Sequence, residues 1–190
     1  TPAHLELALD VYTGLTRRAA PVSRPDVVVW PETAVPASLR YNPEYAAALE
    51  ALFAELDSWL LVGSIDYRRT EPVPDPGASS ASAERDRDRV AVFNSVFLLA
   101  PDGVVRDYYD KTHPVPFGEY VPFEDRFPQL QEAIGMGRSL TAGSEYTVFR
   151  LPRGVRAGVN ICYEDVFPGI SRAFVRRGAN VLMTLTNDAW

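Results

Sequence analysis

Short apolar runs alternate along the chain with segments of helical spacing, and this alternation constrains the fold most. The runs DVVVWPE (26–32), LLVGSID (60–66) and ANVLMTLTND (179–188) are typical of buried strands. Residues 3–19 and 43–60 instead repeat apolar side chains at intervals of three and four, as helices do. Interleaved strands and helices predict a layered α/β fold.

Two hairpin signals add antiparallel pairs to this pattern. Residues 90–111 contain two apolar runs joined at Pro101-Asp102-Gly103, and residues 145–164 contain two more around Arg153-Gly154. The segment DVFPGISRAFVRRG (165–178) predicts a helix that stops at Gly178. The sheet is therefore expected to be mixed.

The size and composition fit one soluble domain. The chain has 190 residues, of which 46% are apolar and 23% charged, enough for a single core. Residues 70–89 are rich in Pro, Ser and charge and predict a mobile surface loop, while 112–144 predict a long ordered loop. The abrupt ends suggest a fragment of a longer protein.

Several classes of function are disfavoured by the same composition. The formal charge is −6 without a dense basic cluster, which argues against a nucleic-acid surface. One cysteine cannot form an internal disulfide, and one cysteine with two histidines is too few for a convincing zinc site. No apolar run approaches the ~20 residues that a membrane-spanning helix needs.

Reactive side chains follow the predicted strands. Glu32, Lys111, Cys162 and Asn187-Asp188 each come at the end of an apolar run. In open α/β sheets the ligand crevice lies outside the carboxyl ends of the strands. We therefore expect these residues to share one site.

Cys162, the only cysteine, has two interpretations. It is a nucleophile if a base or positive neighbour stabilises its thiolate, and a strand-to-helix junction would help because a helix N-terminus favours negative charge. It is otherwise a buried structural cysteine, and this is the better hypothesis when Cys162 is considered without its neighbours.

Its possible partners are also ambiguous one by one. Glu32 suits a general base or a helix-start carboxylate, and Lys111, the only lysine, suits an oxyanion-stabilising cation or a solvent-facing side chain. Glu119 and Glu164 are further carboxylate candidates, and His113 is a weaker candidate for the base. Together these residues favour acyl transfer through a cysteine.

Four segments carry a resemblance to a known family. WPET, DKTHPVPFGEYVPF, NICYEDVFP and TLTNDAW occur in this order between Asp26 and Trp190. They resemble the carbon–nitrogen hydrolase (nitrilase) superfamily and, within it, the branch of apolipoprotein N-acyltransferases. The resemblance implies an α-β-β-α sandwich, here incomplete at its C-terminal end, with residues 1–190 forming a single catalytic domain.

The resemblance also implies roles for particular residues. Glu32 matches the general base, Lys111 the catalytic lysine and Cys162 the nucleophile, while Glu119, Tyr163 and Glu164 match supporting positions. The resemblance implies neither a metal nor an organic cofactor.

The implied reaction transfers an acyl chain from a phospholipid, through a cysteine thioester, to the α-amine of a diacylglyceryl-cysteine lipoprotein. This places the catalytic domain on the extracytoplasmic face of a bacterial cell membrane, held there by segments absent from this chain. Two alternatives remain open. One is a soluble nitrilase-type amidase acting on a small C–N substrate, and the other is a non-catalytic module that binds lipid or a partner.

Overall fold

A computed structural model describes residues 2–39, 41–69, 90–124, 126, 129 and 138–187. Its first half contains α1 (Pro2–Ser23), β1 (Val27–Val35), α2 (Pro43–Phe53), β2 (Trp59–Arg69), β3 (Val90–Leu99) and β4 (Val105–Asp110). Its second half contains β5 (Val148–Arg150), the 3₁₀ helix η1 (Pro152–Gly154), β6 (Arg156–Ile161), the 3₁₀ helix η2 (Cys162–Val166), α5 (Pro168–Arg176) and β7 (Val181–Leu185).

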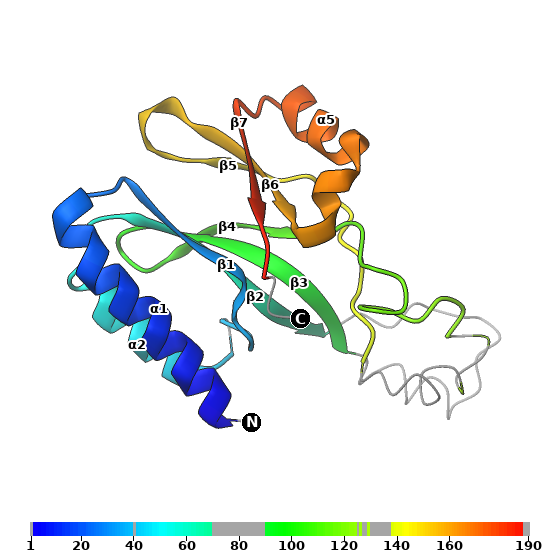
Figure 1. Cartoon of the computed structure of the whole chain (residues 1–190), viewed down its shortest axis with the longest axis horizontal. Helices are drawn as coiled ribbons and strands as arrows, with labels where there is room; N and C mark the ends of the chain where they lie inside the picture. The colour runs from blue at the N-terminus through cyan, green and yellow to red at the C-terminus, as the bar shows by residue number, and fades with distance from the viewer. Residues whose placement is uncertain are drawn as a thin grey trace.

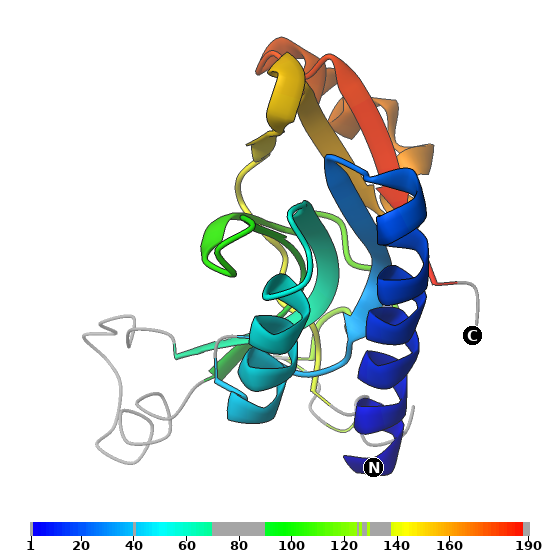
Figure 2. The ribbon, with the colours of Figure 1, turned by 90° about the vertical axis from the view of Figure 1, so that its left-hand side faces the viewer.

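The strands form two sheets. The first has the order β1-β2-β3-β4, with β1 parallel to β2 and the other pairs antiparallel. The second has the order β5-β6-β7, with β5 antiparallel and β7 parallel to β6. In Figure 1, α1 and α2 cover one face of the first sheet, and the second sheet lies on the other side with α5 beyond it. Turned by 90°, Figure 2 shows α1 and α2 packed side by side. The predicted α/β sandwich with mixed sheets is confirmed.

The first sheet is buried on both faces, which explains its nearly continuous apolar runs. Along β2, Leu60 and Val62 join the core beneath α1 and α2, whereas Leu61 between them joins the core between the sheets. Phe97 and Leu98 divide in the same way on β3. Successive strand side chains point to opposite faces, so a strand with helices on one side and a sheet on the other needs apolar residues at both.

The second sheet is held against α5 at close range. Phe149, Val159 and Phe174 are fully buried in the core that it shares with the first sheet. A Cβ at Gly158 would lie 2.5 Å from Phe174 Cβ, so the close approach of α5 to β6 requires glycine there. This packing fixes the end of β6, from which Cys162 follows.

The first helix, expected over 3–19, continues to Ser23, and three further predicted boundaries are wrong. The helix expected over 43–60 ends at Phe53, because Ser58 Oγ and Trp59 N donate to the carbonyls of Pro25 and Asp26 and draw the chain into β2 beside β1. The first strand continues past Pro31, which an edge strand tolerates.

The last wrong boundary lies beside Cys162. The helix expected from Asp165 begins at Pro168, because η2 occupies the residues before it. Both predicted hairpins are confirmed.

Other predictions fall partly outside the described residues. The segment 70–89, expected to be a mobile surface loop, lies outside them, as do residues 125, 127–128 and 130–137 of the long loop. The single-domain assignment of 1–190 stays a prediction. Among the helices that the structure describes, none combines the length and hydropathy needed to cross a membrane.

Candidate active site

Glu32 lies in β1 with its side chain only 2% exposed. Its Oε1 accepts a hydrogen bond from Asn94 Nδ2 at 2.7 Å, and its Oε2 accepts one from the backbone N–H of Asn187 at 3.2 Å. The donors come from β3 and from the segment after β7, so Glu32 joins the two sheets at one end. A solvated loop carboxylate would make neither contact.

Lys111 follows β4 and is 1% exposed, so it is not a solvent-facing lysine. Its Nζ lies 2.8 Å from Glu119 Oε1 and 3.8 Å from Glu32 Oε1. Its backbone is fixed as well, because its N–H donates to the Asn94 carbonyl and its own carbonyl accepts from Gly143, each at 2.8 Å. The ammonium therefore lies between two carboxylates in a buried, preorganised position.

Glu119 is the second of these carboxylates. Its Oε1 receives the lysine and, at 3.3 Å, Asn94 Nδ2, while its Oε2 accepts the backbone N–H of Val115 at 2.7 Å. Glu32, Lys111, Glu119 and Asn94 thus form one connected polar group, called the carboxylate–lysine cluster below. The sequence predicted three of its members.

Cys162 begins η2 and is partly buried against the core between the sheets. Its φ is +52°, a left-handed conformation that is uncommon outside glycine and often occurs at functional sites. The expected strand-to-helix junction is present, but the helix is the short 3₁₀ helix η2, and α5 begins six residues later in the chain, at Pro168. Cys162 is therefore positioned by a tight helical turn directly after a buried strand.

Glu164 connects this turn to the segment after Lys111. The side chain is completely buried, and Oε2 accepts the N–H of Ile161 at 2.9 Å. Oε1 accepts the N–H groups of Thr112 and His113 at 2.7 and 3.2 Å, and the hydroxyls of Thr112 and Tyr109 at 2.9 and 2.8 Å. Burial, and then the charge of Glu164, raise the pKa of Tyr109 well above its usual range. Glu164 therefore holds the backbone just before Cys162 to the backbone just after Lys111.

Two other candidates lie outside the buried cluster. Tyr163 is 52% exposed, and its ring packs edge-on against Phe167. His113 is also exposed, with Nδ1 3.1 Å from Thr112 Oγ1 and its ring 5.1 Å from that of Phe167. The structure therefore brings together Glu32, Lys111 and Glu119, and leaves Tyr163 and His113 at the surface. Glu164 links Ile161 and Thr112, the chain neighbours of Cys162 and Lys111.

Asn94 is the member of the cluster that the sequence reasoning missed. A signal was present, because Asn94 and Ser95 interrupt an apolar run in the middle of a predicted buried strand. Both side chains are buried, and Ser95 Oγ donates to Asp110 at 2.7 Å on the other face of β3. A polar pair in such a strand needs partners, and those partners lie beside Lys111.

Residues 3–190 match the family model of the carbon–nitrogen hydrolases. The chain belongs to the carbon–nitrogen hydrolase family. The apolipoprotein N-acyltransferase of Geobacter metallireducens is 34% identical over 189 residues, which cover 100% of this chain and 33% of that protein. The enzyme of the same name from Chlorobaculum tepidum is 34% identical, covering 97% of this chain and 36% of that protein. The predicted resemblance is confirmed, and the chain spans about a third of the length of these relatives.

Solved structures agree on the fold of this carbon–nitrogen hydrolase family member. The carbon–nitrogen hydrolase of Helicobacter pylori superposes with a TM-score of 0.62 at 16% identity, covering 96% of this chain and 55% of that one. An amidase from Nesterenkonia sp. AN1, which has an active-site cysteine, gives 0.62 at 16% identity over 97% of this chain and 63% of its own. The nitrilase-type sandwich is therefore confirmed.

Proposed function

We propose that this chain carries the catalytic site of an acyltransferase that modifies lipoproteins at the membrane. The observation that supports this most is the buried carboxylate–lysine cluster, together with Glu164, which links the Cys162 turn to the segment that follows Lys111. The names of the relatives favour N-acylation of an apolipoprotein over other acyl transfers. Within this proposal Cys162 is the nucleophile, Glu32 the general base and Lys111 the oxyanion-stabilising cation.

The first half-reaction forms a thioester. Glu32 takes the proton of the Cys162 thiol, and the thiolate attacks the ester carbonyl of a phospholipid. Lys111, fixed between two carboxylates, stabilises the negative oxygen of the tetrahedral intermediate. The C–O bond then breaks, the leaving alkoxide takes the proton from Glu32, and a lysophospholipid departs.

The second half-reaction forms an amide. The neutral α-amine of a diacylglyceryl-cysteine attacks the thioester carbonyl, and Glu32 takes one amine proton. Lys111 stabilises the second oxyanion in the same position. The C–S bond breaks, and the Cys162 thiolate regains its proton from Glu32. Ester is consumed, amide is formed, and the covalent intermediate gives ping-pong kinetics.

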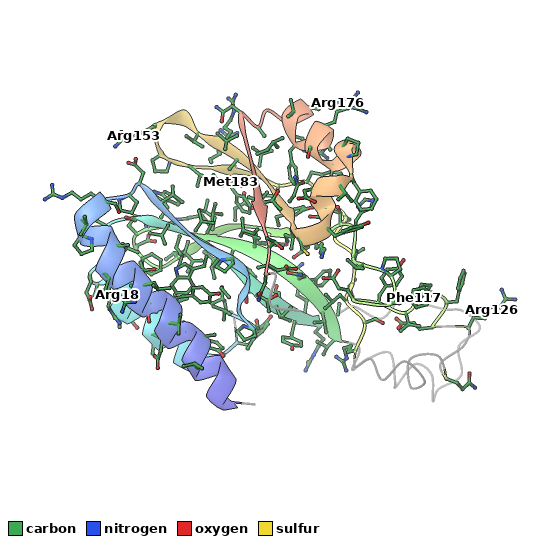
Figure 3. All side chains as sticks on the ribbon, in the orientation of Figure 1. Arg18, Phe117, Arg126, Arg153, Arg176 and Met183 are labelled. Carbon is green, nitrogen blue, oxygen red and sulfur yellow. The ribbon has the colours of Figure 1, made fainter. Side chains whose placement is uncertain are left out.

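The surface beside the site suits a lipid substrate. Phe117 and Phe123 are 61% and 76% exposed on the segment that follows Lys111. Figure 3 shows Phe117 on the opposite side of the molecule from Arg18 of α1. Exposed aromatic side chains favour the boundary between water and lipid, which supports a site at a membrane surface. The extracytoplasmic face of a bacterial cell membrane is part of the proposal. Simple packing of the loop would instead bury such rings.

The test is the mass of the peptide carrying Cys162 after the full-length protein is incubated in detergent with phosphatidylethanolamine. We expect wild type to gain one acyl chain that hydroxylamine removes. Cys162→Ser and Lys111→Ala are expected to gain none within the same time, since loss of one oxyanion donor costs about 10²–10³ in rate. Asp165→Ala, an exposed carboxylate in the same turn, serves as the matched control and should react like wild type.

Two results would overturn this proposal. An adduct from a small amide or ester, with none from phospholipid, would favour an amidase, which the fold of the Nesterenkonia enzyme makes the natural second candidate. No adduct from any donor, with circular dichroism intact, would favour a binding module.

A further inference from the structure

Asn94 occupies an unusual electrostatic position. Its Nδ2 lies 2.7 Å from Glu32 Oε1 and 3.3 Å from Glu119 Oε1, so one amide group donates to two carboxylates. Only one cation, Lys111, contacts the same two oxygens within the described residues. Two carboxylates therefore share one lysine, and Asn94 supplies further hydrogen-bond donors to them without adding charge.

The orientation of this amide is determined by its neighbours. Turned over, Asn94 would place Oδ1 against two carboxylate oxygens, which is repulsive, so Nδ2 must face them. Oδ1 is then buried and has no hydrogen-bond partner among the residues that the structure describes. An unsatisfied buried oxygen is unfavourable, which indicates that the two donated hydrogen bonds outweigh it.

The backbone of Asn94 reinforces the same geometry. Its carbonyl accepts the N–H of Lys111 at 2.8 Å, so one residue holds both the lysine backbone and the two carboxylates that the lysine contacts. Its side chain is 3% exposed, which leaves little freedom for another arrangement. Asn94 is thus placed to set the direction of the Glu32 carboxylate.

We propose that Asn94 is a positioning residue for the reaction: its amide aims Glu32 at the thiol of Cys162 and holds Glu32 and Glu119 in place around Lys111. The role rests on the proposed function, because it acts through Glu32 as the base. A substitution that removes the amide donors of Asn94 should slow proton removal from Cys162 while leaving the thiol accessible.

The experiment measures the rate of iodoacetamide alkylation of Cys162 against pH, by the mass of its peptide, in the full-length protein. Asn94→Asp places a third carboxylate among two at neutral pH, and protonation at lower pH restores an O–H donor. We expect its rate relative to wild type to be lower by about ten- to a hundredfold near neutrality, the worth of one or two hydrogen bonds to a charged group. We expect that ratio to rise toward one as the pH falls.

A matched control is available in β6. Asn160 is equally buried and also has an unpartnered Oδ1 among the described residues, but its Nδ2 faces the hydroxyl of Ser171 at 3.2 Å rather than a carboxylate. Asn160→Asp makes the same chemical change, and its new oxygen can accept from that hydroxyl. We expect its pH profile to follow wild type.

Asn94→Ala separates positioning from charge and decides the question if Asn94→Asp does not fold. It is expected to react slowly at every pH, without recovery. A wild-type profile for either Asn94 variant would overturn the inference. Failure of wild type to take an acyl chain from phospholipid would instead refute the proposed function, while the alkylation comparison would still report on Asn94.

Discussion

Replacing Glu164 by alanine tests whether one buried carboxylate holds the Cys162 turn and the segment after Lys111 together. Five hydrogen bonds end on Glu164, but their loss is not equally costly. The donors of Thr112 and His113 lie on a partly exposed segment and can be hydrated after the change. The Tyr109 hydroxyl keeps a second partner, Thr112 Oγ1 at 3.3 Å, whereas the N–H of Ile161 is buried and loses its acceptor.

The expected magnitude follows from the one buried donor left without a partner, the N–H of Ile161. A buried unsatisfied donor costs about 1–3 kcal/mol, so Glu164→Ala should lose about that much unfolding free energy. That is a sizeable part of the ~5–15 kcal/mol that stabilises a typical domain. Glu164→Gln should lose less, because its carbonyl oxygen still accepts on one side while its amide opposes a donor on the other.

Urea unfolding followed by circular dichroism measures these differences. Asp165→Ala removes the same charge from the next residue, which is exposed, and should change the unfolding free energy by less than about 0.5 kcal/mol. Equal stability of Glu164→Ala and Asp165→Ala would refute the reasoning, since burial and hydrogen bonding are what distinguish the two residues.

Three further perturbations address other parts of the structure. Lys111→Met leaves two contacting carboxylates without their cation and should cost about 3–5 kcal/mol in urea unfolding; unchanged stability would contradict a buried ion pair. Gly63→Ala places a Cβ within 2.8 Å of backbone atoms of β1 and should cost about 1–3 kcal/mol, whereas Gly169→Ala, with nothing within 4 Å, should not destabilise the protein. The raised pKa of Tyr109 means that its stabilising contribution is intact below about pH 10, where the unfolded phenol ionises, and is lost as the pH rises further. Tyr109→Phe should therefore flatten the alkaline decline of the urea midpoint, and an equally steep decline would contradict this assignment.

Local pattern was enough to predict most elements but not all of their ends. The turn at Pro101-Asp102-Gly103 and the β-branched runs have short-range causes, so both hairpins and the mixed sheets could be predicted. The end of α2 could not, because helical spacing continues beyond Phe53 while contacts with Pro25 and Asp26 draw the chain into a strand. Boundaries set by distant partners are not encoded in local periodicity.

The candidate site shows the same division. Glu32, Lys111 and Cys162 follow apolar runs, which marks them as candidates, although the structure places Glu32 inside β1 and only Lys111 and Cys162 directly after a strand. Asn94 lies inside a run, and its importance depends on two carboxylates that come from β1 and from the segment after Lys111. Its role could be inferred only when those three segments were placed in space.

The direction of the Glu32 side chain depends on a bulge in β1, which the spacing of apolar residues in the sequence does not reveal. Trp30 belongs to the core beneath the helices, and in a regular strand Glu32 would share its face. Its carboxylate instead meets Asn94, on the face of β3 that looks toward the second sheet. The pairing of β1 with β2 shifts after Trp30, and Thr33 has a φ of +51°, so the strand bulges and turns Glu32 to the other face. The facing residue on β2 is Gly63, where a Cβ would lie 2.7 Å from Glu32 Cα. A glycine in one strand thus makes room for the bulge that aims the proposed base in the next.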